Sequence, residues 1–276
     1  MPKLTLDLYK SLYDALHAHA RQTGEPIGHI VERALSDALG LDHATLFQVS
    51  TTGAIVQGVY RGAMTLGTLK EHGDFGLGTF DGLDGEMVAL DGEFYQVHAS
   101  GKIEQPRDST LIPFAVVTNF RPSHRADLPA FATLAGLTAA LDRLRRSDNL
   151  FFAVRLDGTF VNMHTRAACK AEEGVSLVAA TAHQAEFTMN DAKGTIVGFW
   201  SPPYARSLNV GGWHLHFLTD DRKGGGHVLG CSGPGMEAAV QDLDDVRLAI
   251  PETREFLEAD LTLDPTAALN ITEKSR

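Results

Sequence analysis

The sequence is poor in cysteine and has no long apolar run. Cys169 and Cys231 are the two cysteines among 276 residues, so at most one disulfide can form, and a reducing compartment is expected. No apolar segment approaches the roughly 20 residues that span a bilayer. The charged start MPKLTLDLYK is unlike a secretory signal. We therefore expect a cytoplasmic protein with no membrane partner.

Basic charge is also scarce. The chain has 24 Lys and Arg against 35 Asp and Glu, a net charge of −11. Such a chain has no global field to attract nucleic acid, and an anionic substrate would need a local arginine, lysine or metal ion. The hydrophobic content of 43% is enough for a core in one large domain or two smaller ones.

The first 40 residues differ from the rest of the chain. Leucines alternate with polar residues over 4–8, which predicts a half-buried strand. Ser11 is placed to cap a helix that ends at Gly24, and Pro26 to open a second helix that ends at Gly40. A strand and two helices in 40 residues are too small to bury a good core alone.

This strand-helix-helix pattern, over about residues 3–40, resembles the ribbon-helix-helix family. The resemblance implies that two chains pair their strands, and that outward strand residues, here Lys3, Thr5 and Asp7, read DNA. Asp7 would repel phosphate, and residues 1–41 carry four basic and five acidic groups, a net charge of −1. A DNA reader normally shows a basic footprint. We therefore favour a dimerisation arm over residues 1–41, with DNA as the disfavoured partner.

From Ala44 onward, short apolar runs alternate with turn signals, including Asp-Gly at 81–82, 84–85 and 91–92. This pattern predicts a meander of strands. One strongly helical stretch interrupts it, from Thr133 to Arg146. Strand patterns then continue toward the C-terminus.

Three histidines carry the sharpest chemical signal. His214 and His216 are two residues apart, so on a strand they point to one face, about 7 Å apart along the chain. If residues 220–226 form a hairpin turn, His227 returns beside them. Three imidazoles can hold zinc and leave one position open for catalysis. On spacing alone, exposed histidines remain the alternative, and iron, copper, nickel or cobalt would also fit.

Several long segments resemble the alpha-acetolactate decarboxylase family in order, over about residues 46–276: LFQVSTTGAIVQGVY, GTFDGLDGE, FFAVRLDGTF, GTIVGFWSPPYA and GWHLHFLTDDRKGGGHVLG. The resemblance implies decarboxylation of 2-acetolactate to acetoin at a zinc ion held by His214, His216 and His227. It also implies an α+β fold. We expect a mixed sheet domain over 44–147 and a β-rich, metal-bearing domain over 148–276, after the arm.

The resemblance carries four further residues into the site. Thr79 and Glu86 stand at the family's positions in the GTFDGLDGE segment. Arg166 ends a segment that reads H-T-R where the family has R-T-R, and Arg155 is the competing arginine. Glu273 is the counterpart of a glutamate near the family's C-terminus. Without the resemblance, Glu86 would be read as a solvated turn carboxylate.

The chemistry of the substrate suggests a role for each group. Loss of carbon dioxide leaves a carbanion, which the neighbouring ketone takes up as an enediolate, and zinc acts as a Lewis acid on the keto and hydroxyl oxygens. Arg166 would orient the anionic substrate. Glu86 and Glu273 would transfer the proton that makes one acetoin enantiomer, although Arg166 could deliver it through a water molecule. The rival function is a DNA-binding regulator with a ligand-sensing, decarboxylase-like domain, and homo-oligomers through the arm and the sheet are expected.

Overall fold

The computed structural model describes residues 5–39 and 44–272. The chain divides into two compact units, Met1–His43 and Ala44–Arg276. None of the helices within the described ranges combines the length and the apolar character that a membrane crossing would require.

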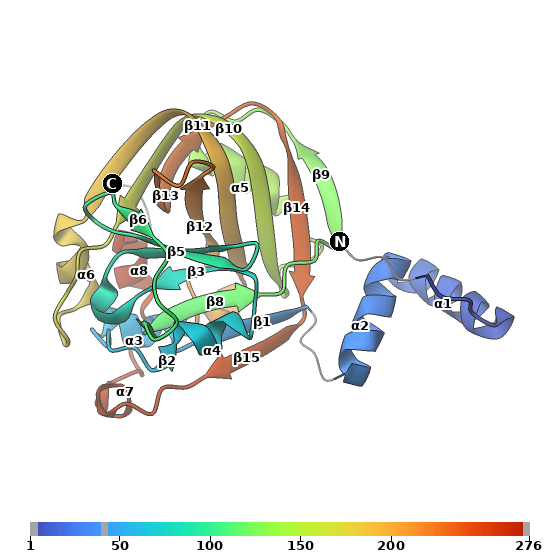
Figure 1. Cartoon of the computed structure of the whole chain (residues 1–276), viewed down its shortest axis with the longest axis horizontal. Coiled ribbons are helices and arrows are strands. Elements are labelled where there is room, and N and C mark those ends of the chain that lie inside the picture. The colour runs from blue at the N-terminus through green and yellow to red at the C-terminus, as the bar shows by residue number, and fades with distance from the viewer. Residues whose placement is uncertain (1–4, 40–43, 273–276) are drawn as a thin grey trace. The chain divides into compact units, whose positions relative to one another are not determined.

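The described part of the first unit contains a pair of helices, α1 (Lys10–Thr23) and α2 (Ile27–Leu39) (Figure 1). Gly24 ends α1 in the left-handed conformation (φ 76°), and its N–H donates to the carbonyl oxygen of Ala20, as a C-terminal glycine commonly does. Both predicted helices are confirmed. The predicted cap at Ser11 is wrong, because α1 already begins at Lys10 and Tyr9 occupies the capping position.

The predicted strand over residues 4–8 is wrong where the structure describes it, because residues 5–9 form no strand. Leu4 lies outside the described residues. Leu6 and Leu8 are 52% and 38% exposed. A five-residue alternating segment needs a neighbouring strand to satisfy its backbone N–H and C=O groups, and the described part of this unit contains only helices beside it. The ribbon-helix-helix resemblance is therefore not supported.

The second unit contains two large sheets. The first is mixed, because β1 is parallel to β15 and antiparallel to β8. One of the predicted Asp-Gly turns, Asp91 and Gly92, joins two of its strands as a two-residue hairpin with both residues at positive φ. In spatial order the strands are β15 (Asp245–Ala249), β1 (Thr45–Val49), β8 (Phe114–Thr118), β3 (Phe75–Thr79), β4 (Glu86–Leu90), β5 (Glu93–Val97) and β6 (Ile103–Glu104).

The second sheet is antiparallel and partly closed. The long strands β10 and β11 pair with each other along most of their length, so β10, β11, β12 and β13 form a closed circuit of pairings. Its strands are β11 (Ala185–Ser201), β12 (Gly212–Thr219), β13 (Gly225–Ser232), β10 (Phe151–Ala167), β14 (Met236–Leu243) and β9 (His124–Leu128). The two large sheets exchange one strand each. Strand β9, from the first half of the chain, pairs in the second sheet, and β15, from the C-terminal half, pairs in the first. The expected boundary between residues 147 and 148 stays a prediction.

Helices in this unit are short. The helix predicted from Thr133 to Arg146 is present as α5, but it ends at Asp142. Thr133 caps it by accepting from the N–H of Gly136. The helical segments are α3 (Thr52–Val56), α4 (Leu66–Lys70), η1 (Asp81–Leu83), α5 (Leu134–Asp142), α6 (Leu177–Ala180), η2 (Thr181–His183), η3 (Pro203–Ala205), α7 (Arg254–Glu258) and α8 (Thr266–Thr272). A two-stranded sheet pairs β2 (Met64–Thr65) with β7 (Leu111–Ile112).

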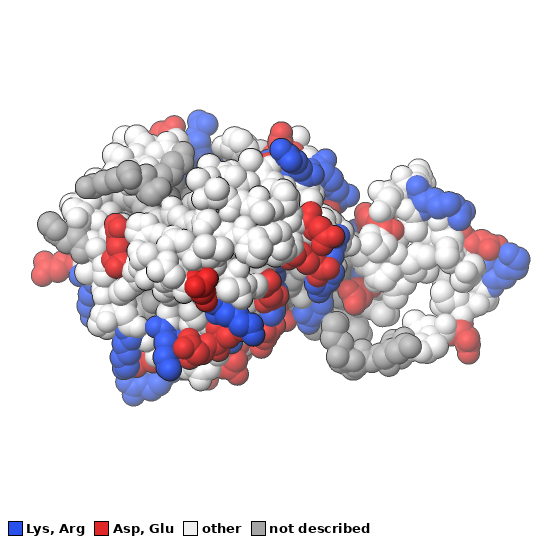
Figure 2. Space-filling view, turned by 90° about the horizontal axis from the view of Figure 1, so that it is seen from above, with Lys and Arg blue, Asp and Glu red and all other residues white. Residues whose placement is uncertain are grey.

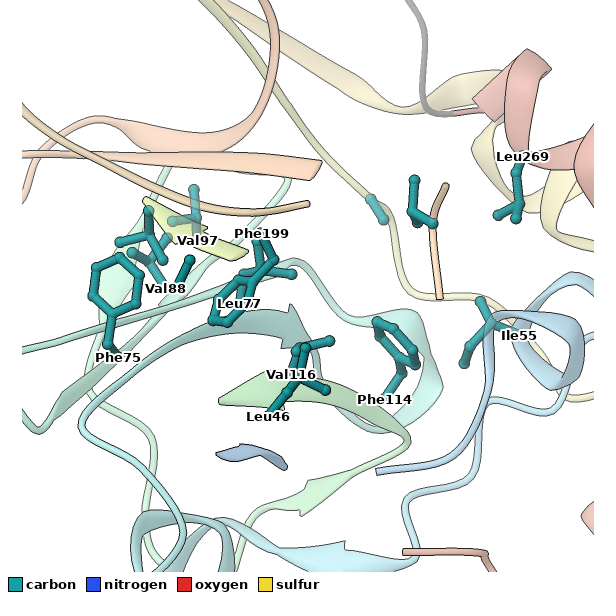
Figure 3. Packing of buried hydrophobic residues seen from close by; sticks show 14 of the residues in the cluster. Leu46, Ile55, Phe75, Leu77, Val88, Val97, Phe114, Val116, Phe199 and Leu269 are labelled. Atoms are coloured by element: carbon teal, nitrogen blue, oxygen red, sulfur yellow. The ribbon is translucent and has the colours of Figure 1, made fainter. Parts of the chain in front are cut away.

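The core joins the two sheets. Figure 2 shows both acidic and basic side chains on the face in view, with uncharged surface between them. Most of the large apolar side chains of the second unit are buried. One buried cluster combines Leu77 and Val116 of the first sheet with Phe199 of the second and Leu269 of α8 (Figure 3). Because both sheets contribute to this cluster, side chains near it can meet from segments far apart in the sequence.

Candidate metal centre and pocket

Strands β12 and β13 form the hairpin that brings three histidines together. His216 lies directly opposite His227 in the register, and His214 is two residues from His216 on the same face. Thr219 organises the turn: its hydroxyl oxygen accepts from the backbone N–H groups of Lys223 and Gly224. The predicted return of His227 is confirmed, although β13 begins at Gly225 and the turn is shorter than residues 220–226.

The ring nitrogens of these histidines converge. Nε2 of His214 lies 3.1 Å from Nδ1 of His227 and 3.2 Å from Nε2 of His216. Ligand atoms of all three residues lie within 4.8 Å of one another. Two nitrogens of a tetrahedral zinc site are about 3.4 Å apart, from Zn–N distances of about 2.0–2.1 Å. The histidine cluster (His214, His216 and His227) therefore has the geometry of a three-histidine metal centre.

The protonation of His216 also suits a metal ligand. Its Nδ1 lies 2.7 Å from the carbonyl oxygen of Met87, which can only accept, so Nδ1 carries the hydrogen and Nε2 presents its lone pair to the cluster. Burial, followed by the nearby His214, holds the pKa of His216 well below its usual range. The three rings are at most 8% exposed. A buried, neutral imidazole is the form that binds a metal.

The first sheet supplies a carboxylate and a hydroxyl group beside this cluster. Glu86 on β4 lies directly opposite Thr79 on β3. One carboxylate oxygen of Glu86 accepts from the N–H of Ala168 at 3.2 Å, and the other lies 3.6 Å from Nε2 of His216. The Thr79 hydroxyl donates to the carbonyl oxygen of Gly85 at 2.7 Å. Glu86 is 7% exposed, so it is not the solvated turn carboxylate that the local sequence suggests.

Arg166 joins the cluster from β10. It lies directly opposite His227 on β13, after an irregularity in the strand pairing between His164 and Thr165. Its side chain is buried, and Nη1 donates to Oε1 of Gln184 at 2.8 Å. Arg155, the competing arginine, instead forms ion pairs with Asp91 and Asp157 at 2.6 and 2.7 Å. Arg155 is thus occupied in ion pairs and is not among the residues that line the pocket described below.

Gly226, the last glycine before His227, allows β13 to approach β10 closely. Its φ is 124°, and a Cβ atom there would meet the backbone carbonyl of Arg166. A side chain at this position would push apart the two strands that carry His227 and Arg166. The glycine run of the hairpin therefore has a geometric function.

A pocket of about 500 Å³, counted to its open mouth, lies against these groups. Its polar lining includes Thr79, Glu86, Arg166 and His214. Most of the other walls are apolar: Ile55, Leu83, Phe114, Leu177, Val210 and Leu269. Local sequence patterns did not predict these apolar residues or Gln184, because single apolar side chains and a single amide form no chemical motif of their own. Glu273 lies outside the described residues; it directly follows α8, whose Leu269 lines the pocket.

Comparisons with a family model, with related sequences and with solved structures all point to one family. The family model for alpha-acetolactate decarboxylase matches residues 46–263. An alpha-acetolactate decarboxylase of Methylococcus capsulatus is 40% identical over 239 residues, covering 85% of this chain and 91% of that protein. One of Bacillus licheniformis is 38% identical over 224 residues, covering 81% and 88%. The crystal structure of the Bacillus subtilis protein superposes with a TM-score of 0.81 at 34% identity, covering 84% of this chain and 100% of that one.

Proposed function

The chain belongs to the alpha-acetolactate decarboxylase family, and we propose that it converts 2-acetolactate to acetoin and carbon dioxide. The observation that carries the proposal is the convergence of three buried histidine rings, one of which, His214, lines a pocket together with Glu86 and Arg166. A carboxy-lyase for a small anionic substrate needs this combination: an electron sink, a cation for the carboxylate and a proton donor.

We propose zinc as the metal, held by His214, His216 and His227, with other divalent transition metals as alternatives. Neutral imidazoles in tetrahedral spacing suit zinc, and an open fourth position would remain for the substrate. Bound there, the metal would supply a Lewis acid toward the keto and hydroxyl oxygens of the substrate.

The protein groups have separate roles in this proposal. Arg166 binds and orients the substrate carboxylate, because a planar guanidinium matches its geometry. When the C–C bond to that carboxylate breaks, carbon dioxide leaves. The electron pair of the broken bond stays on the substrate and becomes part of an enediolate. Glu86 then delivers one proton to carbon, and Thr79 borders the reacting atoms. Glu273 remains a proposed second proton-transfer group.

We also propose that the first unit is a dimerisation arm, which pairs with the first unit of a second copy of the chain. None of the residues of α1 is buried, and Leu12, Tyr13, Leu35 and Leu39 are 42–69% exposed. Two helices that expose so many large apolar side chains need a partner. The net charge of −1 over residues 1–41, in a chain of net −11, makes self-association less repulsive there than elsewhere.

The activity is tested by incubating purified protein with racemic 2-acetolactate and following acetoin. We expect formation well above the spontaneous rate, loss of this activity with a chelator, and recovery on adding zinc. A preparation with confirmed bound metal that forms no acetoin above the spontaneous rate contradicts the proposal. For the arm, deletion of residues 1–41 should lower the mass in solution, and an unchanged oligomer removes the dimerisation proposal. A salt-dependent shift of duplex DNA by the intact chain would favour the regulator instead.

A further inference from the structure

A chain of side chains leads from the surface to the pocket arginine. Arg166 on β10 lies directly opposite Glu186 on β11, and Gln184 bridges them. Nη1 of Arg166 donates to Oε1 of Gln184 at 2.8 Å, and Nε2 of Gln184 donates to Oε1 of Glu186 at 3.2 Å. The other carboxylate oxygen of Glu186 lies 2.9 Å from Nε2 of His164.

The orientation of the Gln184 amide is determined by its two neighbours. The amide has one end that donates and one that accepts. The guanidinium of Arg166 can only donate, so it must face Oε1. Hydrogen bonds from Gln184 and from His164 hold the pKa of Glu186 below its usual range, so at neutral pH the carboxylate can only accept and must face Nε2. The reversed amide would place donor against donor and oxygen against oxygen.

Gln184 also stands at a structural junction. It follows η2, whose first residue, Thr181, lines the pocket together with Leu177 of α6. The segment between β10 and β11 therefore forms part of the pocket wall and ends at the residue that holds the arginine. An arginine side chain has several rotatable bonds, and fixing it before the substrate arrives reduces the entropy lost on binding.

We propose that Gln184 is a positioning residue, which orients the Arg166 guanidinium toward the substrate carboxylate, and that Glu186 fixes the Gln184 amide for this task. The inference rests on the proposed function, because it assumes that Arg166 receives that carboxylate. Neither Gln184 nor Glu186 is among the residues that line the pocket. Their effect passes through Arg166, so it should fall on substrate binding more than on the chemical step.

The first test is Gln184→Leu in the full-length, metal-loaded protein. We expect KM for 2-acetolactate to rise about tenfold while kcat changes less than about threefold, the size of effect that loss of one charge-assisted hydrogen bond produces. Metal content and melting temperature should stay at wild-type values. An unchanged KM, or a loss of activity that follows a loss of metal, overturns the proposal.

The second test concerns Glu186. Glu186→Gln keeps an oxygen that can accept from Gln184, so it should stay close to wild type, whereas Glu186→Leu should raise KM as Gln184→Leu does. Glu237→Leu is the matched control: Glu237 is also a strand glutamate, about half exposed, paired with an arginine, Arg125, at 2.6 Å. A rise in KM for the control equal to that of Glu186→Leu would show a general surface-charge effect and overturn the proposal.

A binding measurement separates this inference from the proposed activity. Calorimetric titration with 2-hydroxyisobutyrate, a 2-hydroxy acid without a ketone, reports carboxylate capture without turnover. We expect Gln184→Leu to weaken its binding about tenfold. Wild-type protein that binds this acid but forms no acetoin contradicts the activity alone. Equal binding by both proteins contradicts the positioning role alone, and wild-type protein that neither binds nor turns over contradicts both.

Discussion

A carboxylate oxygen of Glu86 lies 3.6 Å from Nε2 of His216, although the two residues belong to different sheets. The next residue of the same strand makes the connection, because the carbonyl oxygen of Met87 accepts from Nδ1 of His216. One strand of the first sheet thus orients a histidine of the second and places an acid beside it. The proposed metal-binding and proton-transferring groups meet at this junction.

The proposed acid function of Glu86 can be removed with little change in the shape of the side chain. Glu86→Gln keeps an oxygen that can accept from the N–H of Ala168, but it cannot give up a proton as a carboxylic acid does. We expect acetoin formation to fall by at least about 100-fold, in the range for loss of a general acid, with metal content unchanged. Glu93→Gln, an exposed glutamate in the neighbouring strand β5, is the control. A Glu86→Gln protein with activity within a few-fold of wild type contradicts the proposed role.

The two candidate arginines can be distinguished by conservative substitution. Arg166→Lys keeps the charge but loses the planar fork that matches a carboxylate, so we expect kcat/KM to fall by about 50-fold or more. Arg155→Lys should stay within about threefold, because Arg155 pairs with Asp91 and Asp157 outside the pocket. Steady-state kinetics on both variants check this, and equal losses would show that the assignment to Arg166 is wrong.

Gly226 should tolerate no side chain. Gly226→Ala would place a Cβ atom against the carbonyl of Arg166 at a strained φ, and we expect a loss of about 3 kcal/mol or more in the free energy of unfolding. Urea denaturation measures this loss. Gly230→Ala in the same strand is the matched control, since its Cβ would meet its nearest neighbour, Cβ of His164, at 3.6 Å. Similar stabilities of the two variants would contradict the argument.

Cys231 predicts a loss of stability at alkaline pH. Burial raises the pKa of its thiol to about 12 from an ordinary value of 9.0, and neither cysteine forms a disulfide. Because the folded pKa is raised, the stabilisation is complete below pH 9 and is lost as pH rises from 9 toward 12. The loss reaches about 2 kcal/mol by pH 10.5. Cys231→Ala has no thiol to ionise, so its free energy of unfolding should not fall in this way. The difference in stability between the variant and wild type, measured by urea titration, should therefore shrink between pH 8 and 10.5. A constant difference contradicts the prediction.

Local patterns in the sequence were sufficient for several features. The alternation of side chains along a strand places His214 and His216 on one face, and a short turn returns His227 beside them, so three ligands can be found within 14 consecutive residues. The hairpin at Asp91 and Gly92 follows from the positive φ that such a turn requires. The strand predicted at residues 4–8 fails for the opposite reason: alternation is local, but a strand also needs a partner.

The rest of the site was decided by the tertiary structure. The sequence suggested Glu86 and Arg166 only through resemblance, and it gave no sign of Gln184. Glu86 reaches His216 because two sheets pack on a shared core, and Arg166 reaches His227 because two non-consecutive strands pair in one register. Such pairings depend on the summed burial of many apolar side chains along the whole chain. For this reason the histidine cluster could be predicted from a short segment, whereas the groups around it required the complete fold.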